Sequence, residues 1–290
     1  MLLVWRVLLL LTDDQCTASA AAPVLKHVVT SPKDGHFAAV TSLGDEVFVF
    51  IRGFDRNRLQ VYDANTFIFQ CYITIPGIYS FGCFAACDYF GCLYVSNGFK
   101  NIYRLDRSVV GRKTMKTWKL AYKPFGMSVN NAHNLTVAGS GVNKIKEYTT
   151  HGTLVREIRL EPDMRLWHAI QLSTGDYVVM SMPDDTPGVI SIVGEDGIVR
   201  CRSRAFDVRH MTEASLAVTK NNVILVADRF SNRILSTNHL LSSIQEVHLP
   251  VFSGIKYPFC LYPDESKGRL YVGDLMEENC RLLVFENVKL

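Results

Sequence analysis

The sequence lacks the features that mark several common classes of protein. It has no strong charge excess, since 31 Lys and Arg residues against 28 Asp and Glu residues leave a formal net charge of +3. Such a balance gives no reason to expect a polyanionic partner. Only 10 of the 290 residues are Pro and 48% are hydrophobic, which excludes a collagen-like or largely disordered chain. The chain is therefore long and apolar enough to bury a large core.

Long hydrophobic runs are also missing, apart from one at the amino terminus. Residues 1–11 read MLLVWRVLLLL, which is too short for a bilayer-spanning helix of about 20 residues. Small residues follow, so residues 1–22 are interpreted as a signal peptide or as a leader outside the fold. Arg6 and the two aspartates at 13 and 14 count against a signal peptide. We therefore predict no transmembrane span, and a secreted and a cytoplasmic location stay equally open.

A short apolar strand recurs at a nearly constant interval. Six segments of one form, EVFVF, CLYVS, NLTVA, DYVVM, VILVA and RLYVG, carry Val at the fourth place and follow one another every 42 to 47 residues. Their valines are Val49, Val95, Val137, Val179, Val226 and Val272. This period matches one four-stranded blade of a β-propeller. The sequence thus predicts six blades in a single domain over residues 23–290.

Flanking strands complete each predicted blade. A shorter apolar stretch precedes each valine strand and further strands follow, separated by the Gly, Asn and Asp residues typical of hairpins. The sixth unit lacks a fourth strand, because only five residues follow Phe285. Residues 24–32, VLKHVVTSP, have the character of such a strand. We therefore expect an all-β fold, a monomeric six-bladed propeller of four-stranded antiparallel blades whose ring is closed by this amino-terminal strand.

Three segments resemble NHL repeats. They are 147–158, 175–179 and above all 225–234, in which Asp228 is followed by Asn232, Arg233 and Ile234. The resemblance spans roughly 24–290, while the segments near 97 and 184 depart from the signature. It implies a six-bladed propeller that usually acts as an interaction platform, as in the tripartite-motif ubiquitin ligases, which add zinc-binding modules. Related propellers act as metal-dependent lyases or lactonases, and fold alone does not choose between these functions.

A propeller enzyme would need a site that this sequence does not readily supply. A lyase of the amidating type would hold zinc with three histidines at blade starts, but only His168 stands at such a position, with His36 as the one further candidate. A calcium site needs several converging oxygens, whereas the asparagine pairs 130–131 and 221–222 stand where hairpin turns need them. We therefore predict no catalytic residue, no metal ligand and no cofactor. A secreted propeller lyase or lactonase-type hydrolase with a metal in its channel is the alternative.

One face of the predicted propeller carries the candidate binding residues. Loops from the second to the third strand and from the fourth to the first strand share this face, which we call the loop face. It is predicted to bind a protein or a small ligand through Arg52, Arg56, Lys123, Arg165, His168, Arg209, His210, Arg229 and Lys256. Acidic residues are interleaved with them, namely Asp55, Asp163, Asp184, Asp185, Asp207, Asp228, Asp274, Glu277 and Glu278. This mixture counts against RNA, so an RNA-binding NHL propeller is a second alternative.

The eight cysteines do not form a zinc-binding pattern. Cys83, Cys87 and Cys92 are spaced unlike the ligands of a zinc ribbon, and no matching pair lies downstream. Cys87 and Cys92 flank a short predicted hairpin, so a cross-strand disulfide between them is one interpretation for a secreted protein. The other is a pair of buried free thiols.

Overall fold

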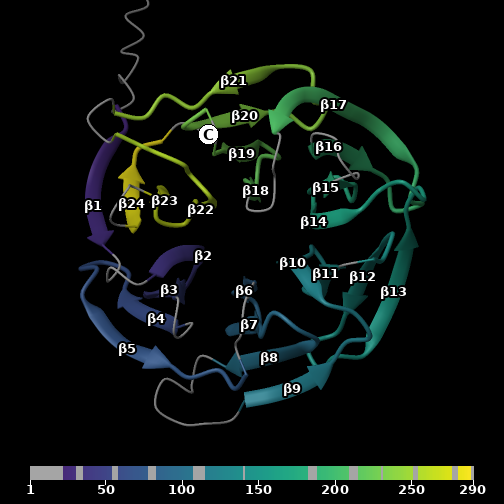
Figure 1. Cartoon of the computed structure of the whole chain (residues 1–290), viewed down its shortest axis with the longest axis horizontal. Coiled ribbons are helices and arrows are strands. Elements are labelled where there is room, and N and C mark those ends of the chain that lie inside the picture. The colour runs from purple at the N-terminus through teal and green to yellow at the C-terminus, as the bar shows by residue number, and fades with distance from the viewer. Residues whose placement is uncertain are drawn as a thin grey trace, which may run out of the picture.

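Six four-stranded antiparallel sheets surround a central axis like the blades of a propeller (Figure 1). A computed structural model of the chain describes residues 22–30, 35–53, 58–77, 83–106, 115–139, 141–181, 188–208, 215–229, 231–250, 254–275 and 280–288. In these ranges, no helix is long and apolar enough to cross a membrane. The predicted all-β, six-bladed fold is confirmed. The interpretation of residues 1–22 as a leader falls almost wholly outside the described residues and stays a prediction.

The strands run outward from the central axis in each blade. Blade 1 comprises β2 (Gly35–Leu43), β3 (Glu46–Gly53), β4 (Arg58–Asp63) and β5 (Phe69–Ile73), and blade 2 comprises β6 (Phe84–Cys87), β7 (Cys92–Ser96), β8 (Asn101–Asp106) and β9 (Met115–Lys119). Blade 3 comprises β10 (Pro124–Val129), β11 (Leu135–Gly139), β12 (Lys144–Tyr148) and β13 (Leu154–Arg159), and blade 4 comprises β14 (Leu166–Gln171), β15 (Tyr177–Ser181), β16 (Gly188–Val193) and β17 (Val199–Val208). Blade 5 comprises β18 (Leu216–Val218), β19 (Ile224–Asp228), β20 (Arg233–Thr237) and β21 (Ile244–Glu246), and blade 6 comprises β22 (Cys260–Asp264), β23 (Arg269–Leu275), β24 (Cys280–Glu286) and β1 (Val24–Thr30).

The second strand of every blade supplies the centre of the core. The six periodic valines lie in β3, β7, β11, β15, β19 and β23, and each is 0% exposed. A second strand has a neighbouring strand on both edges and a neighbouring blade on both faces, so it reads as a continuous apolar run. The recurring strand in the sequence is therefore the buried middle of each blade.

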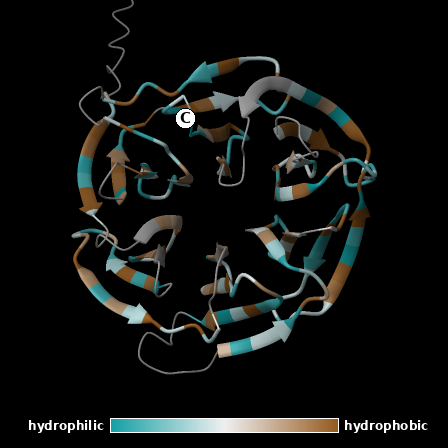
Figure 2. Ribbon diagram, in the orientation of Figure 1, coloured by the Kyte–Doolittle hydropathy of each residue, from teal (hydrophilic) through white to brown (hydrophobic). Residues whose placement is uncertain are grey.

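The outer strands face water on one side. In β1, exposed and partly buried residues alternate along all seven positions. Figure 2 shows the same change between hydrophilic and hydrophobic residues along other strands of the rim. This alternation is typical of an antiparallel strand with one solvated face.

An amino-terminal strand closes the ring. β1 pairs antiparallel with β24, from Val24 opposite Glu286 to Thr30 opposite Arg281. The first strand that the structure describes is thus the fourth strand of blade 6, as the sequence predicts. Blades 6 and 1 also pack together near the central axis, because the buried Cys260 of β22 and Tyr271 of β23 share a core cluster with Phe37 of β2.

Turns on the face opposite the loop face, which we call the turn face, join successive blades. Asn131 donates its side-chain amide to the Leu172 carbonyl at 2.8 Å, connecting blades 3 and 4. The Ser173 backbone N–H donates to Asn222 Oδ1 at 2.8 Å, connecting blades 4 and 5. The Lys220 N–H donates to the Glu265 carboxylate at 2.9 Å, connecting blades 5 and 6. These side chains serve turns and junctions, as predicted for the asparagine pairs.

Candidate functional site

Aromatic and basic side chains from two adjacent blades meet at the loop face. Phe125 lies in β10 and Trp167 in β14, and their rings stack with centroids 4.6 Å apart and planes at 28°. Lys123, just before β10, places Nζ 5.9 Å from the centroid of the Phe125 ring, within the range of a cation–π contact. All three residues are partly exposed. Blades 3 and 4 therefore present a small aromatic and cationic surface.

His168 follows Trp167 in β14 and connects the same two blades. Its partly buried ring places Nε2 3.2 Å from the carbonyl oxygen of Met127 in β10. Because a carbonyl only accepts, Nε2 carries the proton and Nδ1 is an acceptor. Burial lowers the pKa of His168 to about 4, so the ring is neutral at pH 7. We call Lys123, Phe125, Trp167 and His168 the β10–β14 cluster.

Gly126 allows β10 and β14, the first strands of blades 3 and 4, to approach each other closely beneath the cluster. A Cβ atom at this position would lie 2.5 Å from His168 Cδ2 and 2.7 Å from the Trp167 carbonyl oxygen. Only glycine fits such an approach without a shift of the neighbouring strand. Further along the same junction, Ser128 Oγ donates to the Ala169 carbonyl at 2.8 Å. The cluster is therefore built on two strands that are held directly against each other.

The low pKa of His168 predicts that stability depends on pH. The unfolded chain protonates this histidine below about 6.5 and the folded chain only near 4. Between these values the unfolded state binds more protons, so the free energy of unfolding falls as the pH drops, by roughly 2–3 kcal/mol at the acid end. His168→Gln keeps a donor toward Met127 without a titrating ring, so we expect it to remove this part of the pH dependence. Urea unfolding at pH 7 and pH 4.5 gives the free energy of unfolding of both proteins. An equal fall in this free energy between the two pH values in wild type and variant would contradict the prediction.

The other candidate residues lie next to this cluster, at a second junction, or where the structure does not describe their side chains. Arg165 is exposed just before β14, beside the β10–β14 cluster. Arg229 and Lys256 lie at the junction of blades 5 and 6, where the Tyr257 N–H donates to Asn232 Oδ1 at 2.8 Å. The side chain of Arg52 and all of Arg56, Arg209 and His210 lie outside the described residues. Lys123 and His168 thus belong to the β10–β14 cluster and Arg165 precedes Trp167 by two residues, whereas Arg229 and Lys256 lie at the junction of blades 5 and 6.

Two aspartates expected among the surface charges of the loop face are buried instead. Asp228 is 5% exposed and its Oδ2 accepts from Arg233 Nε at 2.9 Å, while Oδ1 accepts from the Ser231 N–H at 3.3 Å. Asp274 is 0% exposed and its Oδ1 accepts from Arg281 Nε at 3.0 Å. Each carboxylate is paired with an arginine at the end of a second strand or one residue before it, because a buried charge requires a partner. The prediction that these two aspartates are surface charges among the basic residues of the loop face was therefore wrong.

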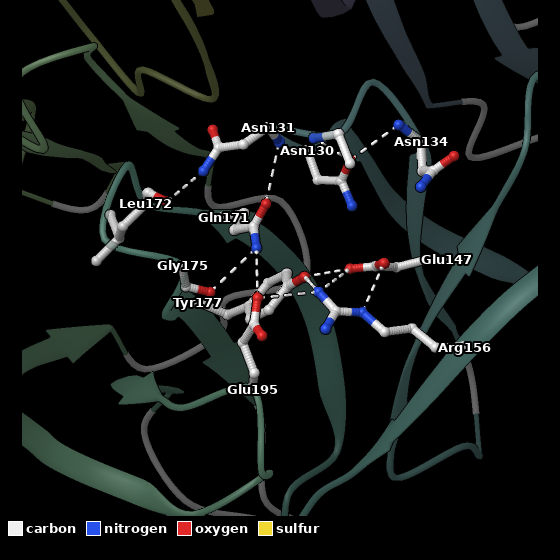
Figure 3. Close-up of polar contacts among 11 residues, drawn as sticks. Asn130, Asn131, Asn134, Glu147, Arg156, Gln171, Leu172, Gly175, Tyr177 and Glu195 are labelled. Carbon is white, nitrogen blue, oxygen red and sulfur yellow. Dashed lines mark hydrogen bonds and ion pairs between the residues drawn. The ribbon is translucent and has the colours of Figure 1, made fainter.

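A polar network joins blades 3 and 4 on the turn-face side of their junction (Figure 3). The sequence did not predict this network. Arg156 of β13 donates from Nε to Glu147 Oε2 at 2.7 Å and from Nη2 to Tyr177 Oη at 2.8 Å. The Tyr177 hydroxyl in turn donates to Glu147, and Glu195 accepts from Arg156 Nη2 at 3.2 Å. Glu147 and Arg156 are directly opposite in the ladder of β12 and β13. The opposite charges in this predicted hairpin were the signal that could have identified the pair.

Metal-ligating side chains do not gather in the part of the chain that the structure describes. There, no three His, Cys, Asp or Glu residues lie together as a set that could hold a metal ion. The oxygens considered for calcium are also separated, because Asn130 and Asn222 belong to turn-face turns and Asp228 ends its strand at the loop face.

Comparison with known proteins identifies the class of fold. No protein-family model and no curated protein matches the sequence. Among solved structures, a Bacteroides thetaiotaomicron protein of unknown function has a TM-score of 0.65 at 12% identity, over 88% of this chain and 71% of that chain. A catalytically inactive virginiamycin B lyase from Staphylococcus aureus, solved with quinupristin, has a TM-score of 0.56 at 11% identity, over 89% of this chain and 98% of that chain. Kuenenia stuttgartiensis hydrazine synthase has a TM-score of 0.57 at 16% identity, over 84% of this chain and 75% of that chain.

These likenesses establish the fold and go no further. All identities are between 11% and 16% in the three cases given, a range in which one fold supports unrelated activities. The chain is a six-bladed β-propeller, and its activity has to be argued from its own side chains.

Proposed function

We propose that this propeller is a non-enzymatic binding module that holds a protein or small-ligand partner on its loop face. The observation that carries the proposal is the β10–β14 cluster. Stacked Phe125 and Trp167 rings and the Lys123 cation are partly exposed at the loop face. Aromatic residues on a rigid base are typical anchors of binding surfaces, because they bury much area at little cost in conformational entropy.

The ionisable groups at this face also favour binding over catalysis. His168 is neutral and uses Nε2 in a hydrogen bond between blades. Asp228 and Asp274 accept from arginines of their own blades. A general acid or base must be able to reach the substrate, and these groups serve the fold instead. A propeller lyase or hydrolase with a metal in its channel is the competing function.

We also infer that the propeller is of the NHL type. The string 225–234 occupies β19, the loop after it and the start of β20. Asp228 organises this loop by accepting from the Ser231 N–H and from Arg233. Asp274 and Arg281 repeat the arrangement in blade 6. The recurrence of one aspartate–arginine pair at corresponding places is the support for this assignment.

Site-specific photo-crosslinking tests the binding surface. A photoreactive residue replaces Asp163, which is exposed beside Arg165 on the loop face, and in a control protein it replaces Ile198, which is 58% exposed on the turn face of the same blade. We expect one partner to crosslink at 163 and not at 198, and the combined change of Lys123 and Arg165 to Ala to reduce that crosslink severalfold. Equal labelling at both positions would contradict the proposal, and crosslinked RNA would favour the RNA-binding alternative.

Metal analysis separates the binding module from the enzyme. The purified full chain is dialysed without chelator and measured for calcium and zinc. We expect neither metal in stoichiometric amount. One equivalent of either, retained through dialysis and lost together with stability on chelation, would overturn the non-enzymatic reading.

A further inference from the structure

Positive charge is concentrated on the loop face of blades 2 and 3. The loops there and the strand ends next to them form what we call the basic sector, which comprises residues 97–100, 119–123, 141–144 and 159–165. Its basic residues are Lys100, Lys119, Lys123, Lys144, Arg159 and Arg165, and its acidic residues are Glu161 and Asp163. All of these side chains are exposed or partly exposed. One of the two acidic residues, Glu161, already forms an ion pair with Arg202 of β17, so the sector keeps a clear excess of positive charge.

Backbone hydrogen bonds connect the two segments of this sector within each blade. In blade 2, the Leu120 N–H donates to the Lys100 carbonyl at 2.6 Å. In blade 3, the Leu160 N–H donates to the Asn143 carbonyl at 2.9 Å. The basic side chains are therefore carried by loops whose backbones contact each other.

The basic sector adjoins the aromatic rings of the β10–β14 cluster. A Cβ atom at Gly139 would lie 2.9 Å from the Lys123 carbonyl oxygen, so the loop of blade 2 packs directly against the end of β11 in blade 3. Lys123 Nζ lies 5.9 Å from the centroid of the Phe125 ring, which stacks on Trp167. Arg165 precedes Trp167 by two residues. Two successive loops of the sector thus place basic residues next to the ring pair.

We propose that the loop face recognises its partner through a short acidic peptide segment that carries an aromatic or aliphatic residue. This inference rests on the proposed function, because it names the chemistry of the partner. The apolar residue packs on the rings of Phe125 and Trp167, and the carboxylates next to it pair with the side chains of the basic sector. Opposite charges across an interface speed the encounter and select the partner, while aromatic anchors supply much of the binding free energy.

A short acidic segment matches these observations better than a nucleic acid does. The chain has a net charge of only +3 and a sequence pI of about 8.4, whereas nucleic-acid-binding domains typically have a pI above about 9. Base stacking also needs ring faces that are open to solvent, and Phe125 and Trp167 each use one face on the other. The positive charge is a local property of two blades, as a short partner segment requires.

Selection from a displayed library of random peptides of about 12 residues tests the acidic class. The full chain is the bait, and Lys123→Glu combined with Arg165→Glu gives the variant for comparison. We expect the selected peptides to be enriched in Asp and Glu around an aromatic or aliphatic residue, and to bind this double variant at least about tenfold more weakly than wild type. A selection that enriches no peptide, or peptides without acidic residues, would overturn the inference.

A matched variant separates the place of the charge from its amount. Lys116→Glu combined with Lys220→Glu makes the same change in net charge at exposed positions of the rim strand β9 and of the turn face. Its affinity for the selected peptides should stay within about twofold of wild type, because distant charges are screened. An equal loss in both double variants, or tighter binding of an oligouridine of about 12 nucleotides than of the peptides, would contradict the proposal. In wild type, raising NaCl from about 50 to about 300 mM should weaken peptide binding at least about tenfold, which decides the matter even where a variant folds poorly.

Competition distinguishes a failure of this inference from a failure of the proposed function. The selected peptides are added to the crosslinking experiment with the photoreactive residue at position 163, and we expect them to displace the partner. A partner that crosslinks there and is not displaced would overturn the acidic class and leave the binding module intact. The absence of any crosslinked partner would instead overturn the binding module itself.

Discussion

Deletion of residues 24–30 is expected to lower the thermal unfolding midpoint by more than about 10 °C, because it removes the strand that closes the ring. β1 forms the outer edge of blade 6 and pairs with β24 over its whole length. Leu25 and Val29 of β1 pack against two different core clusters, which contain residues of blades 5 and 6 and of blades 6 and 1. Lys26 also forms an ion pair with Glu286 at 3.4 Å. The deletion thus loosens blade 6 on both sides.

The expected loss is large relative to the stability of a folded domain, which is about 5–15 kcal/mol. Once β1 is gone, β24 becomes an exposed edge and the apolar side chains beneath it meet water. Calorimetry of the shortened and the full chain measures the difference. Removal of residues 1–21 alone is the control and should leave the midpoint within about 2 °C, since the strand ladder is intact.

Attaching β1 after β24, at the other end of the chain, should restore the stability that the deletion removes. Val24 lies opposite Glu286, so the start of β1 adjoins the end of β24, and a short loop can join them in a circularly permuted chain. We expect this permuted protein to regain most of the lost stability, because the same ladder forms as a hairpin. A deletion without effect, or a permutation that restores nothing, would show that the pairing of β1 with β24 does not close the ring.

The repeat and the closure could be predicted from the sequence because both depend on patterns within single strands. Val49 and Val272 occupy the same place in blades far apart in the chain, and both are fully buried. A strand with neighbours on both faces requires apolar residues at successive positions, and this requirement is visible without a structure. The missing fourth strand of blade 6 was likewise a matter of counting strands.

Contacts between blades could not be predicted in the same way. Tyr177 and Glu147 are 30 positions apart and meet only because blade 4 packs against blade 3. Asp228 and Asp274 were expected at the surface, since the sequence does not show that an arginine of the next strand covers each of them. The stacking of Phe125 on Trp167 also depends on the junction of two first strands. The periodic pattern therefore defines the blades, whereas the candidate site arises where blades meet.

Arg156→Met is expected to destabilise the protein by about 3–5 kcal/mol, because it leaves a buried carboxylate without its cation. The Glu147 side chain is 2% exposed, and the arginine contacts it through Nε at 2.7 Å and Nη2 at 3.1 Å. In the variant, the Tyr177 hydroxyl is the one described side-chain donor to Glu147 that remains. Burial and the adjacent carboxylate raise the pKa of Tyr177, so its hydroxyl stays neutral. A neutral hydroxyl can donate a hydrogen bond to Glu147 but cannot compensate its charge.

Two further variants distinguish the cost of leaving a buried charge unpaired from the cost of losing a surface ion pair. Lys144→Met removes one positive charge from the same sheet, where Lys144 and Glu157 are 32% and 28% exposed and Lys146 still contacts Glu157. It should cost less than about 1 kcal/mol, as exposed ion pairs do. Glu147→Leu combined with Arg156→Met removes both charges and should recover much of the loss, since an apolar pair can replace a buried ion pair. Urea unfolding gives the three values, and equal losses in Arg156→Met and Lys144→Met would show that the burial of Glu147 does not set the cost.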